Sequence, residues 1–448
     1  MKTYDVIVVG AGPGGYVAAI RAAQLGMNTA LIEKAKLGGM CLNWGCVPAR
    51  RLMESARAYS QVLGASAFGV EGFDSACVRF NWKKAVGEKE RIVGKLVKGI
   101  EFLLKKNKVQ VISGEARLLR GHEVHVAGEV LTAGHIIIAT GSRPDRAPLA
   151  SLPANLVVEV DDLFSRTDVP EKLVIAGGDT VACETASMLS LIRRRVTVAA
   201  PEERLMPWMD ESLSRFVADK FKKSGIRVIT GVRITSSQGG ISVGDEIVEA
   251  DAVVNCSRRT AILPPMEDTP LDLRDGFVEI NEFMQTSVPS VYAIGDVTGR
   301  IFAHVASAQG VCAVHHIAGL REPVDYLRMP VTLYMEPEIG AVGFTEEELK
   351  QRGIEYVKGE FPMTASSKAL IEGNTEGFVK ILADQKYGEV LGVHVVASHA
   401  ADLIGEAAMC MRTEGTLDDL IRVVHAHPTV SETFREAGFK ASGKPLHM

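Results

Sequence analysis

The sequence lacks three features, and each absence argues against a class of protein. It has no apolar stretch near the ~20 residues that span a bilayer, which argues against a membrane protein. Its net charge of -5 lacks the positive excess that a nucleic-acid or anionic-membrane partner requires. No leader precedes the apolar strand that we expect from Tyr4 onward. Together these absences predict a cytoplasmic protein.

Cysteine is also scarce. The chain has seven, which is an odd number and too few for a framework of structural disulfides. Two of them, Cys41 and Cys46, are separated by four residues at the start of an expected helix, a spacing that indicates a redox-active disulfide. In a continuous helix, residues five apart point about 140° away from each other, so the sulfurs could not bond. We therefore expect Cys41 in a distorted entry turn and a thiolate favoured by the helix N-terminus. Two unrelated buried cysteines are the alternative.

The amino-terminal residues have the pattern of a dinucleotide-binding unit. A predicted strand ends at Val9, and Gly10, Gly12 and Gly15 then satisfy the G-x-G-x-x-G motif before a predicted helix. A second predicted strand ends about twenty residues on in Glu33, where a carboxylate can bond a ribose hydroxyl. This combination favours a bound dinucleotide over a glycine turn without one.

The same pattern returns in degraded form from Lys172 onward, and at 448 residues we expect two to four domains. The middle glycine of the motif normally lets the backbone approach a pyrophosphate, but Asp179 stands there. A carboxylate about 4 Å from a phosphate is unfavourable by up to roughly 4 kcal/mol at an effective dielectric near 20. Either Asp179 caps its helix beside a shifted nucleotide, or the nucleotide site has been lost. The acidic position is Ala200, and the candidate contacts are Gly177, Gly178, Asp179 and Ala182.

The residues after Pro330 have the pattern of a mixed strand and helix module. His427 precedes a proline, and Glu432 follows five residues later, so the two can serve as a base and its orienting carboxylate. On spacing alone, a histidine in a structural turn is the favoured interpretation. We expect antiparallel strands at Thr332–Met335, Gly340–Phe344, Gly377–Leu382 and Glu389–Val396, and a helix at Ala400–Arg412.

Five segments in order make the chain resemble the flavoprotein disulfide reductase family over essentially its whole length, and the dihydrolipoamide dehydrogenases most within it. The five are the Gly10 motif with Glu33, the Cys41–Cys46 segment, Ala139-Thr140-Gly141, Ala293–Asp296 and His425–Glu432. The resemblance implies an α/β fold with two Rossmann-like dinucleotide-binding domains, the second degenerate, and a carboxy-terminal α+β dimerisation domain. It implies an FAD-binding domain from residues 1–145 and 265–330, an NAD(P)-type domain at 146–264 and an interface domain at 331–448.

The resemblance also implies roles for single residues. Cys46 faces the flavin as a charge-transfer thiolate, and Cys41 exchanges with the substrate dithiol. His427 of the other subunit, oriented by Glu432, takes the thiol proton. Beside the flavin an ion pair is expected between Arg50, in place of the usual lysine, and Glu184. FAD is expected to contact Gly10, Gly12, Gly15, Glu33, Gly39, Met40, Ala116, Ala139, Thr140, Gly141, Asp296, Ala303 and His304.

The implied function is oxidation of protein-bound dihydrolipoamide through the disulfide and FAD to NAD(H), by a homodimer and without a metal. The last residues carry no further redox pair of the kind found in mercuric ion reductases and large thioredoxin reductases. Glu432 is followed by Thr433, and not by the second glutamate typical of glutathione reductases, which favours a lipoyl substrate. Asp179 and Ala200 keep open a same-fold oxidoreductase with a protein or quinone as electron partner. A noncatalytic lipoyl-protein scaffold is the third possibility.

Overall fold

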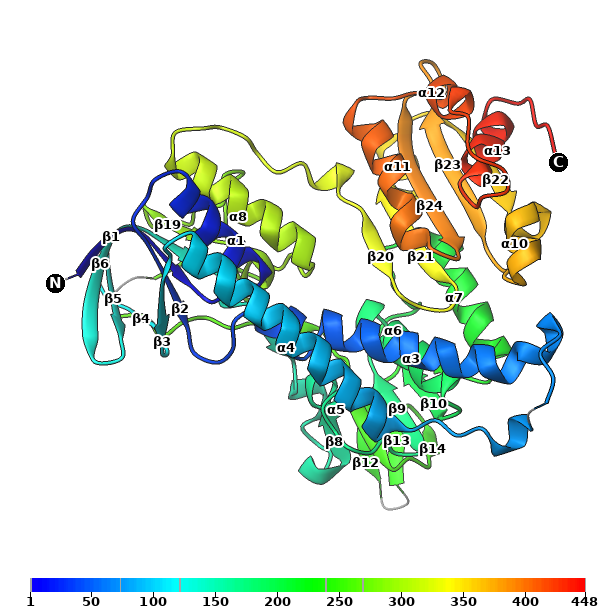
Figure 1. Ribbon diagram of the computed structural model, residues 1–448, viewed down its shortest axis with the longest axis horizontal. Coiled ribbons are helices and arrows are strands. Elements are labelled where there is room, and N and C mark those ends of the chain that lie inside the picture. Colours follow the sequence, from blue (N-terminus) through cyan, green and yellow to red (C-terminus); the bar gives the residue numbers. More distant parts are fainter. Residues whose placement is uncertain (1, 73, 121, 238–239, 268–269, 448) are drawn as a thin grey trace.

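The first sheet joins the amino-terminal residues to one strand from much later in the chain (Figure 1). The computed structural model describes residues 2–72, 74–120, 122–237, 240–267 and 270–447. The strand order is β3-β2-β1-β6-β5-β4, with β19 also paired to β6. Residues 6–9 of β1 are all buried, as in a parallel strand covered on both faces. The bounds are β1 Lys2–Val9, β2 Thr29–Glu33, β3 Gln110–Ser113, β4 Arg117–Leu118, β5 Glu123–Val126, β6 Glu129–Ile138 and β19 Val291–Ala293.

The second sheet repeats the first in smaller form, in the order β11-β10-β9-β15-β8 with all neighbours parallel. The strand, helix and strand predicted from Lys172 are confirmed as β9, α6 and β10. The chain enters and leaves this unit through the antiparallel pair of β7 and β16. The domain boundaries expected from the sequence stay a prediction. The bounds are β7 Ser142–Pro144, β8 Val157–Glu159, β9 Lys172–Ala176, β10 Arg195–Ala199, β11 Arg227–Ile229, β15 Ala252–Asn255 and β16 Arg259–Ala261. A hairpin sheet adds β12 Ile234–Ser237, β13 Gly240–Val243 and β14 Glu246–Val248, and a second hairpin pairs β17 Leu273–Arg274 with β18 Phe277–Val278.

The third sheet is antiparallel and belongs to the carboxy-terminal unit, in the order β20-β21-β24-β23-β22. The four predicted strands and the predicted helix are confirmed, while β22 is an edge strand that the sequence pattern did not predict. The strands are β20 Val331–Leu333, β21 Glu338–Gly343, β22 Tyr356–Pro362, β23 Phe378–Asp384 and β24 Val390–Ala397.

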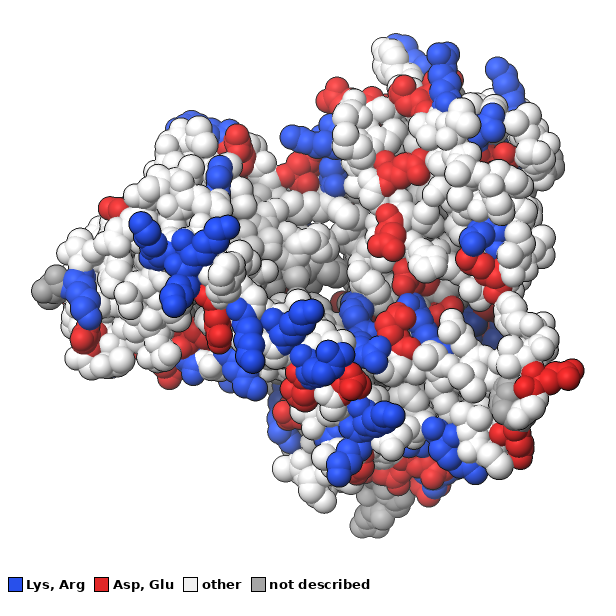
Figure 2. Space-filling view, viewed as in Figure 1, with Lys and Arg blue, Asp and Glu red and all other residues white. Residues whose placement is uncertain are grey.

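Helices surround the three sheets, and two long ones, α3 and α4, pack side by side between the units (Figure 1). Figure 2 shows Lys and Arg side chains gathered along α4. Within the described ranges, every helix is too short or too polar to span a bilayer. The bounds are α1 Pro13–Gln24, α2 Gly39–Asn43, α3 Cys46–Gly64, α4 Trp82–Lys106, α5 Val160–Leu163, α6 Thr180–Leu191, α7 Glu211–Lys223, α8 Ala303–Ile317, α9 Glu346–Arg352, α10 Ser367–Glu372, α11 Ala400–Arg412, α12 Leu417–Arg422 and α13 Glu432–Ala441.

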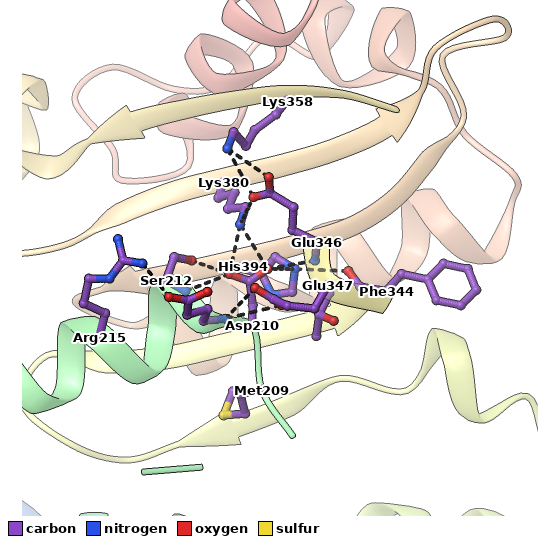
Figure 3. A network of polar contacts seen from close by, with 12 residues as sticks. Met209, Asp210, Ser212, Arg215, Phe344, Glu346, Glu347, Lys358, Lys380 and His394 are labelled. Carbon is purple, nitrogen blue, oxygen red and sulfur yellow. Dashed lines mark hydrogen bonds and ion pairs between the residues drawn. The ribbon is translucent and has the colours of Figure 1, made fainter. Parts of the chain in front are cut away.

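A buried ionic network joins the second unit to the third (Figure 3). Asp210, which caps α7, accepts hydrogen bonds at 2.9 and 3.0 Å from the ammonium of Lys380 on β23, and both side chains are buried. The same ammonium lies 2.7 Å from the carboxylate of Glu346, the first residue of α9. Burial alone would raise the pKa of Glu346. The hydrogen bonds that its carboxylate accepts from Lys380 and from neighbouring side chains instead lower the pKa to about 2. Because this folded pKa lies below the ordinary value, the stabilisation is present above that value and is lost as the pH falls toward 2.

Lys380→Met is expected to lower the free energy of unfolding by about 3–5 kcal/mol, because it leaves the buried carboxylate of Asp210 without its ammonium partner. Denaturant unfolding of the whole chain measures the loss. Lys358→Met is the matched control, since Lys358 also bonds Glu346, at 3.1 Å, but is 45% exposed. Its loss is expected below about 1 kcal/mol. Equal losses in the two variants would contradict the importance given to the buried pair.

Candidate active site

Cys41 and Cys46 lie on either side of a break between two helices. Cys41 is inside α2, and Cys46 is the first residue of α3. Gly45 leaves helical geometry between them, with φ -113° and ψ -110°. Gly38 and Gly39 enter α2 with positive φ, a conformation that favours glycine. The predicted distortion of the entry turn is therefore confirmed.

The two thiols of this pair differ in acidity. Both are free, and Cys41 donates a hydrogen bond to Cys46. This bond lowers the pKa of Cys46, and the charge of Arg50 lowers it further, against the effect of burial. The same bond, together with burial, raises the pKa of Cys41. The position of Cys46 at the N-terminus of α3 also favours a thiolate. Cys46 is thus the more acidic thiol of the pair, and Cys41 is the less acidic one.

Arg50 connects the cysteine pair to the other two units. Its Nη1 lies 2.8 Å from Oε2 of Glu184 on α6, so the expected ion pair is present. Its guanidinium lies 3.6 Å over the ring of Tyr334, whose backbone N–H donates to Oε1 of Glu184 at 2.8 Å. Arginine therefore adds a stacking contact beside the ion pair. Tyr334 was not predicted as a site residue, because it follows β20 without any motif of its own.

The first cradle, residues 10–15 at the turn into α1, fits the pyrophosphate of FAD. A Cβ on Gly10 would stand 2.3 Å from the carbonyl oxygen of Ala139, and a Cβ on Gly15 would stand 1.8 Å from that of Gly10. At Gly12, in contrast, no described atom lies within 4 Å of the place of a Cβ. Nor does any described side chain cap α1. The helix N-terminus therefore faces open space, as an anion site requires.

Two carboxylates mark the ends of the expected FAD site. Glu33 accepts the N–H of Ala11 at 2.7 Å and that of Ala35 at 2.8 Å, which fixes its carboxylate beside the cradle with lone pairs left for a ribose. At the other end, the hydroxyl of Ser142 donates to Oδ2 of Asp296 at 2.6 Å. Burial raises the pKa of Asp296. Asp296 therefore has one partner in place and can bond a polyol chain as well.

A cavity of about 570 Å³ extends from the first cradle to the cysteine pair. Ala116 is not among its described lining residues and is buried in the core of the first sheet instead. Within the described ranges, no group of three or more His, Cys, Asp or Glu side chains is arranged to hold a metal. The predicted residues that line the cavity are Gly10, Gly12, Gly15, Glu33, Gly39, Met40, Cys41, Cys46, Arg50, Ala139, Thr140, Gly141, Glu184, Asp296, Ala303 and His304.

His427 and Glu432 form a pair in the third unit. Nδ1 of His427 lies 2.9 Å from Oε1 of Glu432, and Oε2 of Glu432 accepts the N–H of Thr429 at 2.9 Å. Burial opposes ionisation of Glu432, but these two partners hold its pKa below the ordinary value. The side chain of His427 is 72% exposed, and it is not among the described residues that line the cavity. The orienting contact is thus present, at a distance from this chain's own cysteines.

The second cradle, residues 177–182 at the turn into α6, is occupied by the side chain of Asp179. Oδ1 of Asp179 accepts the N–H of Thr180 at 2.7 Å and the indole N–H of Trp208 at 2.8 Å. Trp208 in turn has its ring edge-on to Phe302, with centroids 6.3 Å apart. Trp208 was not predicted as a site residue. In this arrangement the second cradle does not fit a pyrophosphate, although a cavity of about 340 Å³ lies beside it.

Comparisons with known proteins agree with this architecture. A family model described as pyridine nucleotide-disulphide oxidoreductase matches residues 4–310, and the dimerisation domain of the same family matches residues 329–438. A dihydrolipoyl dehydrogenase of Bacillus subtilis is 37% identical over an alignment of 474 positions, gaps included, which covers 99% of each chain. A dihydrolipoyl dehydrogenase of Cupriavidus necator is 37% identical over 477 residues, with full coverage of both. The crystal structure of LpdA from Mycobacterium tuberculosis has the same fold, with a TM-score of 0.87 at 22% identity over 98% of this chain and 99% of that one.

Arg50→Gln is expected to raise the pKa of Cys46 by about one pH unit, because it removes a nearby positive charge and leaves Glu184 unpaired. The thiolate then forms at higher pH, which a titration of the reduced protein by ultraviolet thiolate absorbance measures. Arg51→Gln is the matched control, since it removes the neighbouring charge and leaves the ion pair intact. An equal shift in both variants would contradict the role given to Arg50.

Proposed function

Because the chain belongs to the pyridine nucleotide-disulphide oxidoreductase family, we propose that it is an FAD-dependent dihydrolipoamide dehydrogenase with NAD(H) as its pyridine nucleotide. The observation that carries the proposal is the Cys41–Cys46 pair on the wall of a cavity that fits FAD, with Cys46 as the thiolate. The names of the two full-length relatives support the choice of substrate.

The reaction at the cysteine pair is a dithiol–disulfide exchange. One thiol of dihydrolipoamide gives its proton to His427 and attacks Sγ of Cys41. The bond between Cys41 and Cys46 breaks, and Cys46 leaves as the thiolate that its surroundings stabilise. The sulfur of the second substrate thiol then bonds to the first, the bond between the first substrate sulfur and Cys41 breaks, and Cys41 leaves with the proton of the second thiol. The substrate departs as a disulfide, and two electrons remain on the cysteine pair.

FAD, when bound, accepts these two electrons and makes them available to a pyridine nucleotide. The residues of the chain hold FAD in position. The open N-terminus of α1 takes the pyrophosphate, Glu33 takes the ribose, and Asp296 takes the polyol chain. Arg50 and Glu184 supply a neutral pair beside the cysteines, so the cavity wall gains no net charge there.

We also propose a homodimer in which each site takes its base from the other subunit. The dimerisation domain, residues 329–438, contains His427. Its exposed imidazole and its absence from the described lining of this chain's cavity support this assignment. In a two-fold dimer both sites are completed at once, because the same surfaces meet twice. The partner's His427, with its tautomer fixed by the carboxylate of Glu432, then faces Cys41.

Anaerobic dihydrolipoamide is expected to reduce the flavin of the holoenzyme, because its exchange with the Cys41–Cys46 disulfide releases Cys46 as the thiolate that its surroundings stabilise. Flavin absorbance in a stopped-flow instrument measures the rate. Cys46→Ser is expected to lower this rate by a factor of about 10³ or more.

Each alternative predicts a different result in that experiment. A flavin that dihydrolipoamide does not reduce would refute the proposed substrate. Little loss in Cys46→Ser would favour a noncatalytic lipoyl-protein scaffold. Reduction by dihydrolipoamide without reoxidation by NAD⁺ would favour a protein or quinone as electron partner, the alternative to which Asp179 points.

Mixed dimers test the shared site. Cys46→Ser and His427→Gln are each expected to be nearly inactive, whereas co-expressed chains are expected to recover roughly a quarter of the wild-type activity per dimer. Half of the random dimers then contain both variants, and each of these has one site with intact cysteines and an intact histidine. A site built within one chain would give no recovery, so the absence of activity in the mixed dimers would refute the shared arrangement.

A further inference from the structure

The two cradles share the backbone conformation of their N-cap residues, where one has a glycine and the other a carboxylate. The N-cap residue of α1, Gly12, has φ -67° and ψ -179°, and that of α6, Asp179, has φ -91° and ψ -176°. Gly177 has the positive φ of Gly10, and a Cβ on it would stand 2.4 Å from the carbonyl oxygen of Cys256. The second cradle therefore keeps the first glycine and the N-cap conformation of a phosphate site, with the side chain of Asp179 added at the N-cap.

The occupant of the second cradle is the carboxylate of Asp179. Its Oδ1 takes the N–H of Thr180, the kind of donor that a bound phosphate uses at a helix N-terminus. The indole N–H of Trp208 bonds the same oxygen, and the contact of Trp208 with Phe302 connects this arrangement to the segment before α8. Asp179 thus supplies the negative charge at the place where a dinucleotide brings its own.

A second carboxylate beside the cradle lacks a partner. Oε2 of Glu202 is buried and has no hydrogen-bond partner among the described residues. It lies 3.3 Å from the place of a Cβ on Gly178, while Ala200 fills the position that is acidic in the usual motif. In the first cradle the comparable carboxylate, Glu33, bonds two backbone N–H groups. Glu202 therefore points an unused acceptor at the same cradle, as the hydroxyls of a ribose require.

We propose that Asp179 is a built-in competitor for the pyrophosphate of NAD(H), held in place by Trp208, and that Glu202 is the ribose acceptor in place of residue 200. This inference rests on the proposed function and specifies its nucleotide site. NAD(H) enters by displacing the carboxylate of Asp179 from the N-terminus of α6. The affinity for the dinucleotide is accordingly low, and one side chain sets it.

Calorimetric titration of the FAD-loaded dimer with NAD⁺ tests the proposal. Asp179→Gly is expected to tighten the dissociation constant at least tenfold, and glycine suits the site because Gly12 holds the same backbone conformation. Asp179→Asn keeps the acceptor oxygen but loses the charge, so a smaller tightening is expected. Trp208→Phe, which removes the indole N–H and keeps an aromatic ring, is expected to tighten binding as well. Asp74→Asn, at another exposed N-cap, is the matched control and is expected to leave binding unchanged.

The role of Glu202 is tested in the same titrations on the Asp179→Gly protein. Glu202→Gln is expected to weaken NAD⁺ binding about tenfold there, whereas its neighbour Glu203→Gln is expected to leave it unchanged. Equal effects of the two would refute the ribose role. Dissociation constants of Asp179→Gly and Asp179→Asn within twofold of the wild type would show Asp179 to be a helix cap alone and overturn the competitor.

These outcomes separate the inference from the proposed function. Reduction of the flavin by dihydrolipoamide takes place at the cysteine pair, so its rate in the wild type is decided independently of the NAD⁺ affinities. If dihydrolipoamide fails to reduce the flavin in the wild type, the proposed function falls. The NAD⁺ affinities still decide the role of Asp179 in that case.

Discussion

The carbonyl oxygen of Met40 is the acceptor on which the cysteine turn depends. It accepts the N–H of Trp44 at 3.0 Å and that of Gly45 at 2.7 Å, which ends α2 before Cys46 begins α3. A single helix would hold the two sulfurs on different faces. Because the chain stops one helix and starts another within three residues, the sulfurs can meet, and the second one gains a helix N-terminus. A Cβ on Gly45 would stand 3.1 Å from the same oxygen, so a larger residue would press on this acceptor.

The acidity of the pair then follows from what surrounds it. Cys46 is stabilised as a thiolate by a hydrogen bond from Cys41 and by the charge of Arg50, and the same hydrogen bond keeps Cys41 protonated. The two sulfurs thus differ in acidity although they lie in one short turn. Arg50 is held in turn by Glu184 and by the ring of Tyr334, so all three structural units contribute to the charge of one sulfur.

Much of the fold could be predicted from the sequence where local pattern and tertiary structure agree. The helix Ala400–Arg412 has the predicted bounds, and both glycine motifs lead into the expected helices. Strand β22 could not be predicted, because Gly359 weakens its pattern for a reason that lies elsewhere in the chain. A Cβ there would stand 1.9 Å from the carbonyl oxygen of Ala437, so the glycine permits close approach of α13. The contacts of Trp208 and Tyr334 likewise join segments whose proximity exists only in the folded chain.

The third unit is therefore more than a surface for a second subunit. Lys380 on its sheet forms an ion pair with the cap of α7 in the second unit. The backbone N–H of Tyr334 donates to the carboxylate that is paired with Arg50. A buried ionic contact favours one arrangement of its groups, because a shifted arrangement leaves a charge unpaired away from water. The same unit that carries His427 thus also fixes the position of the nucleotide unit relative to the cysteines. The charge beside Cys46 and the position of the second cradle consequently depend on the same set of contacts, those that the third unit makes with α6 and α7.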